Sequence, residues 1–218
     1  MKIIALLFAL LLPALASAGA YEDMEEALIR GDPGAAINLI KRGVDVNTVD
    51  KAGNTLLIQA VRRDVPELFD YLLLRRAKLN VRNRNGETAL SLAAYTGKLQ
   101  YVQRLVEAGA DINFYGWSPL TYAAYNGHTA IVDYLLKRGA EINATTENGS
   151  SALFFAARFG HIEVIKLLLK NKADPTLANE NGDTAIDWAL KSDNTDIADL
   201  LRAAGGRSGR AVVIDFSK

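Results

Sequence analysis

The sequence predicts an all-α repeat solenoid, and three observations lead to this prediction. Residues 116–143 match residues 149–176 at a fixed offset of 33, so that His128 falls on His161. Each matched stretch contains a pair of alanines followed by a glycine, and then a second segment with an apolar stripe. Self-similarity at a period of this length is typical of solenoids, in which each helical unit buries its apolar face on its neighbours.

Residues 1–20 precede the repeats and predict a secretory signal peptide. Lys2 supplies a positive charge, an apolar run follows, and the segment ends in the small residues "ALASAGA". This order is typical of signal peptides, and cleavage after Ala18 or after Ala20 fits it equally well. The apolar run is about ten residues long, whereas a membrane-spanning helix needs roughly 20. We therefore expect export, with no membrane attachment after cleavage.

The amino-acid composition bears on where the protein acts and on what it can bind. The chain has 25 basic and 25 acidic residues and a formal net charge of zero, which argues against a nucleic-acid partner because such proteins present a basic surface. It has no cysteine, so its stability outside the cytoplasm has to come from packing rather than from disulfides. This favours a periplasmic localisation, with secretion beyond the cell as the alternative.

The repeat region, residues 21–206, divides into about six units. Their ranges are 22–49, 50–82, 83–113, 114–145, 146–178 and 179–206. A hydroxyl that can cap a first helix recurs at Thr55, Thr88, Ser118, Ser151 and Thr184. In the first unit Asp32 is the expected cap, and Pro33 follows it in the first helical turn. The second helix of each unit supplies an apolar stripe, as at Val164, Ile165, Leu168 and Leu169.

Some positions depart from the repeat. Arg76 and Lys172 stand where the second helix usually ends in glycine, and a left-handed conformation there would cost roughly 1–2 kcal/mol each. Asp64 and Asp193 replace the glycine after the first helix, a milder change because Asp tolerates this conformation. The connection "NFYGWS", residues 113–118, is three residues shorter than its counterparts. We expect that it cannot form an extended hairpin finger.

On these residues the chain resembles the ankyrin-repeat family, with its pattern G-x-T-P-L-H-x-A-A, then G-H, then V-V-x-L-L-L, then G-A-D-V-N. Matching stretches include "GWSPLTYAAYNGH" and "EAGADIN". The resemblance covers nearly all of the chain after residue 20. It implies helix–turn–helix units with loop or β-hairpin fingers, and binding of proteins through the fingertips and the concave face, with no chemistry of the repeat's own.

The resemblance also implies a class of function. Exported bacterial members of the family protect, restrain or assist other envelope enzymes, so it implies a scaffold that regulates or protects against a periplasmic enzyme. The alternative is a secreted, host-directed effector, and an enzyme is the least favoured class. We expect a protein partner, no nucleic acid and a monomeric state.

No pattern in the sequence indicates catalysis, a cofactor or a metal. His128 and His161 are the only two histidines, and both occupy the Gly-His position, where the imidazole is expected to bond the backbone at the helix junction. Two histidines without cysteine do not make a zinc site, which needs four ligands when it is structural. No glycine-rich string matches a phosphate-binding loop.

Residues 207–218 form a predicted tail outside the repeats. Gly205 and Gly206 end the last helix, and residues 211–216, "AVVIDF", have a strand-like composition. A solenoid end needs a cover for its exposed face, and this segment is a candidate for it. The other interpretation is a disordered end.

The candidate binding surface consists of positions without a role in the core. Those just before the glycine that ends a first helix are Arg62, Arg63, Tyr95, Thr96, Tyr125, Asn126, Arg158 and Phe159. The finger side adds Arg82, Arg84, Glu87, Tyr115, Trp117 and Glu147. Tyr, Trp and Arg are the residue types that dominate binding hot spots. The aromatics at Tyr122, Phe155 and Trp188 occupy another helical position and are expected to pack between helices.

Overall fold

The computed structural model describes residues 19–209. The predicted signal peptide up to residue 18, and the strand-like segment 211–216, lie outside the described residues. The chain divides into two compact units, Met1–Ala89 and Leu90–Lys218. Within the described part every regular element is a helix, apart from three isolated β-bridges, which confirms the all-α repeat fold. No helix in residues 19–209 has the length and apolar character needed to cross a membrane.

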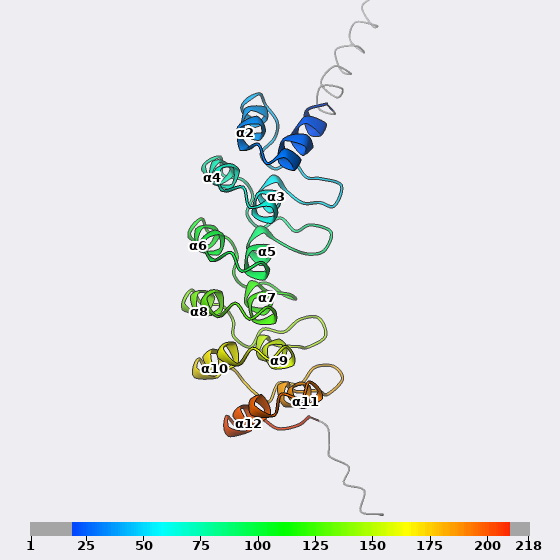
Figure 1. Ribbon diagram of the computed structural model, residues 1–218, viewed down its shortest axis with the longest axis vertical. Coiled ribbons are helices and arrows are strands. Elements are labelled where there is room, and N and C mark those ends of the chain that lie inside the picture. The colour runs from blue at the N-terminus through cyan, green and yellow to red at the C-terminus, as the bar shows by residue number, and fades with distance from the viewer. Residues whose placement is uncertain (1–18, 210–218) are drawn as a thin grey trace, which may run out of the picture. The chain divides into compact units, whose positions relative to one another are not determined.

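The first unit contains a helix over residues 19–30, followed by α2 (Pro33–Lys41), α3 (Leu56–Arg63) and α4 (Pro66–Leu74). Helix α4 packs against both α2 and α3, and Figure 1 shows α2 and α4 on the same side of the first unit. Two of the predicted caps are present here. The side chain of Asp32 accepts a hydrogen bond from the Ala35 amide, and the Thr55 side chain accepts one from the Ile58 amide.

The second unit begins within α5 (Ala89–Tyr95). The helices that follow are α6 (Leu99–Glu107), α7 (Pro119–Tyr125), α8 (Thr129–Lys137), α9 (Ala152–Arg158), α10 (Ile162–Lys170), α11 (Ala185–Lys191) and α12 (Thr195–Ala203). Helices α7, α9 and α11 pack in sequence as one layer, and α6, α8 and α10 pack in sequence as a second (Figure 1). The short first helix and the longer second helix of each pair therefore lie in separate layers.

Paired alanines hold the layer of first helices together. Ala123, Ala124, Ala156 and Ala157 are fully buried. A methyl group at these positions allows adjacent helices to approach closely, and the second helices then fill the remaining space with larger side chains such as Leu135. Burial of one leucine side chain contributes about 1.5–3 kcal/mol, so the apolar stripe accounts for much of the stability of each pair.

The junctions confirm the predicted left-handed positions. Asp64 and Asp193 follow first helices at φ of 59° and 57°, and Arg76 and Lys172 follow second helices at 55° and 67°. Where another repeat has a glycine after its first or second helix, that glycine also has a positive φ, as Gly127 does at 73°. The four non-glycine residues therefore carry backbone strain that glycine would relieve.

The fingers are tight loops that precede each first helix. Isolated bridges join Val49 to Thr55, Thr145 to Ser151 and Ala178 to Thr184. The short loop 113–118 contains no such bridge, and neither does the longer finger before α5. Its Gly116 is buried beneath the carboxylate of Glu147, so close that a Cβ on Gly116 would lie 2.3 Å from the Glu147 Oε1.

Candidate functional site

Four of the predicted aromatic residues form a connected aromatic surface in the second unit, made of Tyr95, Trp117, Tyr125 and Phe159. The ring of Tyr125 is central, with centroid distances of 6.3 Å to Tyr95, 5.7 Å to Trp117 and 4.4 Å to Phe159. These residues come from three consecutive repeats. Side-chain contacts therefore join the helix ends that carry Tyr95, Tyr125 and Phe159.

The aromatic surface is partly accessible to solvent. Tyr95 and Phe159 are each 40% exposed, and Trp117 and Tyr125 are half-buried. Edge and tilted ring contacts of this kind add about 0.5–1.5 kcal/mol beyond the burial of area. The rings are therefore held in fixed positions while part of their apolar area remains available to another molecule.

The expected separation between outer and inner aromatics is not found. Trp117 also lies 5.1 Å from Tyr122 and 4.7 Å from Phe155. Tyr122 contacts Tyr95 edge-on at 5.7 Å. Phe155 is buried, as expected for packing between helices, but Tyr122 is only half-buried and supports the exposed rings directly. Because Tyr122 lies one helical turn before Tyr125 on α7, the two rings belong to one cluster.

Tyr115 lies apart from the aromatic surface. Its side chain is 73% exposed and, among the described residues, it makes no ring contact with the other four aromatics. Instead Tyr115 lines an open groove of about 300 Å³ together with Asn113, Phe114, Glu141, Ala144 and Thr145. Tyr115 therefore does not take part in the ring contacts, because the shortened loop turns at Gly116, with φ of 93°.

Arg158 adds a cation to the edge of the aromatic surface. Its guanidinium carbon lies 4.3 Å from the Trp188 ring and 5.3 Å from the Phe159 ring. Lys191 also approaches Trp188, at 4.6 Å, and its ammonium forms an ion pair of 3.0 Å with Asp183. Trp188 is therefore contacted by two cations, and such cation–π contacts are worth about 0.5–1 kcal/mol when exposed.

The two histidines hold the backbone beneath the aromatic surface, which confirms their predicted role. The Nε2 of His128 lies 3.0 Å from the carbonyl oxygen of Tyr95, and the Nε2 of His161 lies 2.9 Å from that of Tyr125. Each imidazole also covers the glycine at the end of the preceding first helix. A Cβ on Gly127 would lie 2.6 Å from the Nδ1 of His161.

Thr96 and Asn126 direct their polar groups to the backbone. The Thr96 hydroxyl donates to the carbonyl oxygen of Leu92 at 2.8 Å, and the Asn126 side-chain amide donates to that of Tyr95 at 2.6 Å. These two predicted site residues therefore shape the ends of α5 and α7. Glu147 has a similar structural role, since its carboxylate covers Gly116.

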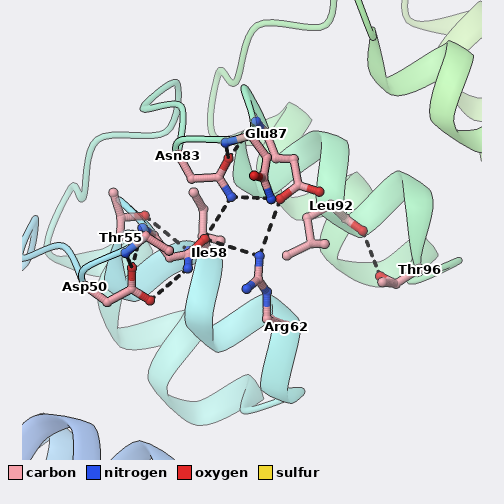
Figure 2. Close-up of polar contacts among 11 residues, drawn as sticks. Asp50, Thr55, Ile58, Arg62, Asn83, Glu87, Leu92 and Thr96 are labelled. Carbon is pink, nitrogen blue, oxygen red and sulfur yellow. Dashed lines mark hydrogen bonds and ion pairs between the residues drawn. The ribbon is translucent and has the colours of Figure 1, made fainter.

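The first unit contains a separate polar network around Arg62 and Glu87 (Figure 2). Asn83 connects the two fingers, because its side-chain amide donates to Asn54 Oδ1 at 2.8 Å and to Glu87 Oε2 at 2.7 Å. Arg62 donates to the same two oxygens, at 3.2 Å and 3.4 Å. Arg62 and Glu87 are thus engaged mainly with each other and with the fingers.

Asp50 anchors the other end of this network. Its carboxylate accepts hydrogen bonds from the Ala52 amide and from the amide and side chain of Asn54, all at 2.8 Å. Partial burial opposes ionisation of Asp50, but these hydrogen bonds and the charge of Arg62 outweigh it and lower the pKa of the carboxyl group below its ordinary value. The carboxylate therefore stays ionised and orders the finger.

The remaining predicted residues of the first unit are exposed arginines. Arg63, Arg82 and Arg84 all have exposed side chains. The backbone of Arg84 is fixed, because its amide donates to the carbonyl oxygen of Ala52 at 3.0 Å. The candidate site residues therefore form a basic and polar group in the first unit and an aromatic group in the second.

The described residues contain no group of three or more His, Cys, Asp or Glu side chains placed to hold a metal ion. Both imidazoles are engaged with carbonyl oxygens, as described above. The candidate site residues instead present aromatic rings, arginines and finger loops that another molecule can contact.

The sequence matches the family model described as "Ankyrin repeats (3 copies)" over residues 24–113, 57–146 and 143–208. The chain is similar to the B-cell lymphoma 3 protein homolog of Mus musculus, 38% identical over 78 residues, or 35% of this chain and 17% of that protein. It is also similar to ankyrin repeat domain-containing protein SAT10 of Stachybotrys chartarum, 33% identical over 95 residues, or 44% of this chain and 5% of that protein. Similarity to the neurogenic locus Notch protein of Drosophila melanogaster is 42% over 79 residues, or 36% of this chain and 3% of that protein. The matched regions thus span at most 17% of these relatives.

Proposed function

The chain belongs to the ankyrin-repeat family, and we propose that it is a non-catalytic, monomeric scaffold outside the cytoplasm that binds a periplasmic enzyme and regulates it or protects against it. Ankyrin repeats mediate protein–protein interactions, so the coarser part of this proposal, a protein-binding scaffold, follows from the family. The finer part concerns where the chain acts and what it binds.

The observation that supports the proposal most strongly is the aromatic surface. Tyr95, Tyr125 and Phe159 come from three consecutive repeats, contact one another, and remain at least partly exposed. A protein needs no exposed aromatic row for solubility, whereas Tyr, Trp and Arg are the commonest hot-spot residues of interfaces. Arg158 at the edge of the surface supplies the third of these residue types.

A non-catalytic role is supported by how the polar side chains are used. His128 and His161 bond the carbonyl oxygens of Tyr95 and Tyr125, and neither belongs to a pair of nucleophile and base. Nucleophilic catalysis by an activated hydroxyl requires a nucleophile and a base within hydrogen-bond reach of each other. Both histidines instead support the backbone that carries the aromatic surface.

Action outside the cytoplasm is supported by residues 1–20, with their charged start, apolar run and small residues. Fractionation of the source cells tests this part. Recovery of the protein by osmotic shock, without residues 1–18 or 1–20, supports a periplasmic location. Recovery from the culture medium would instead favour the secreted, host-directed effector.

Affinity capture tests the partner. The purified protein is immobilised and incubated with a periplasmic extract, and retained proteins are identified by mass spectrometry. We expect an envelope enzyme to be retained by the wild type and lost from a Tyr95→Ala, Phe159→Ala double variant. A Glu163→Ala, Lys166→Ala double variant, which removes an exposed ion pair on α10, is the control and should retain it. Equal retention by both variants would contradict the proposal.

A further inference from the structure

The end of helix α4 differs from the ends of the equivalent second helices. Leu74 is the last residue of α4, and its side chain is 78% exposed. The last residues of the other second helices are Lys41, Glu107, Lys137, Lys170 and Ala203. Only the second repeat therefore places a large apolar side chain in solvent at this position, next to the arginines at positions 75 and 76.

Arg76 occupies a strained backbone position. Its φ is 55°, where three of the equivalent residues are Gly43, Gly109 and Gly139. Left-handed backbone is unfavourable for a residue with a Cβ, so glycine would be the more stable choice. Lys172 is the equivalent residue of the fifth repeat and has a similar φ of 67°. This pair provides a matched comparison below.

Leu74, Arg75 and Arg76 form one side of a groove of about 460 Å³. The other side is the turn after α2, and the full lining is Ile40, Gly43, Val44, Asp45, Val46, Leu74, Arg75 and Arg76. Ile40 is buried at 4% exposure and forms an apolar floor, and Val44 and Val46 are half-buried. The groove therefore combines an apolar base with polar and charged rims.

A hydrogen bond between the two sides fixes the width of the groove. The side-chain oxygen of Asn47, on the turn after α2, accepts from the Lys78 amide at 2.8 Å, just beyond α4. The helices themselves pack against each other, and Figure 1 shows α2 and α4 as neighbours. The groove is thus formed by ordered backbone on both sides.

The charge of the groove is positive. In residues 19–209, neither Arg75 nor Arg76 forms an ion pair with a carboxylate. Asp45 is the only acidic residue in the lining, and its carboxylate accepts hydrogen bonds from the amide and the side chain of Asn47. Two guanidinium groups therefore remain available, and guanidinium binds carboxylates in a bidentate geometry.

We propose that this groove binds an extended peptide that carries a bulky apolar side chain next to one or more carboxylates. The apolar side chain packs against Ile40, Val44 and Leu74, and the carboxylates pair with Arg75 and Arg76. A peptide fits better than an anionic membrane, because Leu74 is the only exposed large apolar residue of the lining and one such side chain offers little apolar area for insertion into a bilayer. The inference goes beyond the proposed function, since the groove lies on the second helices of the first unit.

Fluorescence anisotropy with a dye-labelled peptide of sequence Gly-Glu-Asp-Leu-Phe tests this site in the purified full chain. Two matched peptides replace the acidic pair with Lys-Lys or the apolar pair with Ser-Ser, and each should bind at least about tenfold more weakly. Leu74→Ser and Arg75→Glu should weaken binding of the first peptide by about tenfold or more. Lys137→Ser, at the equivalent helix end of the fourth repeat, should leave the affinity unchanged.

Variants at Arg76 and Lys172 distinguish an effect on peptide binding from an effect on stability. Arg76→Gly and Lys172→Gly should both raise the melting temperature, because each relieves a left-handed backbone. Only Arg76→Gly should weaken peptide binding. The Tyr95→Ala, Phe159→Ala double variant should bind this peptide normally, so that failure here is distinguishable from failure of the aromatic surface as an interface.

Several results would overturn the proposal: no binding of the acidic apolar peptide, equal binding of all three peptides, or equal affinities of Leu74→Ser, Arg76→Gly and the wild type. Stronger binding to vesicles of anionic phospholipid than to neutral vesicles, lost in Leu74→Ser, would assign the groove to a membrane surface instead.

Discussion

The ring of Phe159, at the end of α9, lies 4.4 Å from the ring of Tyr125, the last residue of α7. This contact joins two consecutive repeats at the exposed edge of their first helices. The same rings therefore stabilise the packing of repeats and provide the area proposed for partner binding. Variants at this surface have to be assessed for both effects, and stability measurements come first.

Phe159→Ala should lower the free energy of unfolding by about 0.5–1.5 kcal/mol more than the loss of buried area alone, because it also removes the ring contact with Tyr125. Urea denaturation followed by circular dichroism measures this change. Ile162→Ala is the control, since Ile162 is 37% exposed and has no ring. An equal loss in both variants would mean that the ring contact adds nothing beyond burial.

Gly127→Ala should destabilise the protein by about 2–3 kcal/mol, the sum of left-handed strain and loss of the hydrogen bond from His161. The new Cβ would lie 2.6 Å from the His161 Nδ1 and displace the ring from the Tyr125 carbonyl oxygen. Gly139→Ala is the matched control, because Gly139 also has positive φ, 88°, with no atom within 4 Å of the added Cβ. It should cost only the strain, about 1–2 kcal/mol. Equal losses would show that His161 does not support the junction.

Asp187 should make the last repeat sensitive to acid. Burial opposes its ionisation, but hydrogen bonds from Ser208, Thr184 and the Gly209 amide outweigh this and hold the pKa of the carboxyl group below its ordinary value. Because the pKa is lower in the folded state, the stabilisation is fully present above the unfolded pKa of about 3.9 and is lost as pH falls through the folded pKa.

Urea denaturation from pH 7 down to pH 3 tests this linkage. The stability difference between the wild type and Asp187→Asn should be constant near neutral pH and should shrink below about pH 4. Asp196→Asn, on the exposed side of α12, is the control. A difference that does not change with pH would mean that the hydrogen bonds to Asp187 do not depend on its charge.

The repeats and their helix ends were predictable from the sequence, because their signals are local. The Ser118 and Ser151 caps, the left-handed Arg76 and the short loop 113–118 each depend on a few neighbouring residues. The Gly-His signal likewise places both imidazoles correctly. A period of 33 residues is sufficient to align such features from one repeat to the next.

The aromatic surface was only partly predictable, because ring contacts depend on tertiary geometry. Phe159 lies one position after the residue in register with Tyr125, yet the two rings meet. Trp117, at the end of the short loop, contacts Tyr122 on α7, and the course of that loop depends on the positive φ of Gly116. The spacing of the aromatic residues therefore does not predict which rings touch.

The contacts of Asp187 with Ser208 and Gly209 were also not predictable from the sequence. Residues 207–209, the start of the predicted tail, return to the beginning of α11, where the Arg207 carbonyl oxygen accepts from the Thr184 hydroxyl at 2.9 Å. The Ser208 hydroxyl donates to the Asp187 carboxylate. The repeat pattern gives no signal for this return, because the residues that make it follow the last repeat.

Isothermal titration calorimetry of the captured envelope enzyme with the wild type and a Trp117→Ala, Tyr125→Ala double variant tests the central claim most directly. The measurement is made at a temperature where circular dichroism shows both proteins to be folded, since Trp117 also packs on Phe155 at 4.7 Å. If the aromatic surface is the binding site, the double variant should bind the enzyme more weakly by well over about 1 kcal/mol, or more than about fivefold. An unchanged affinity in the folded double variant would contradict it.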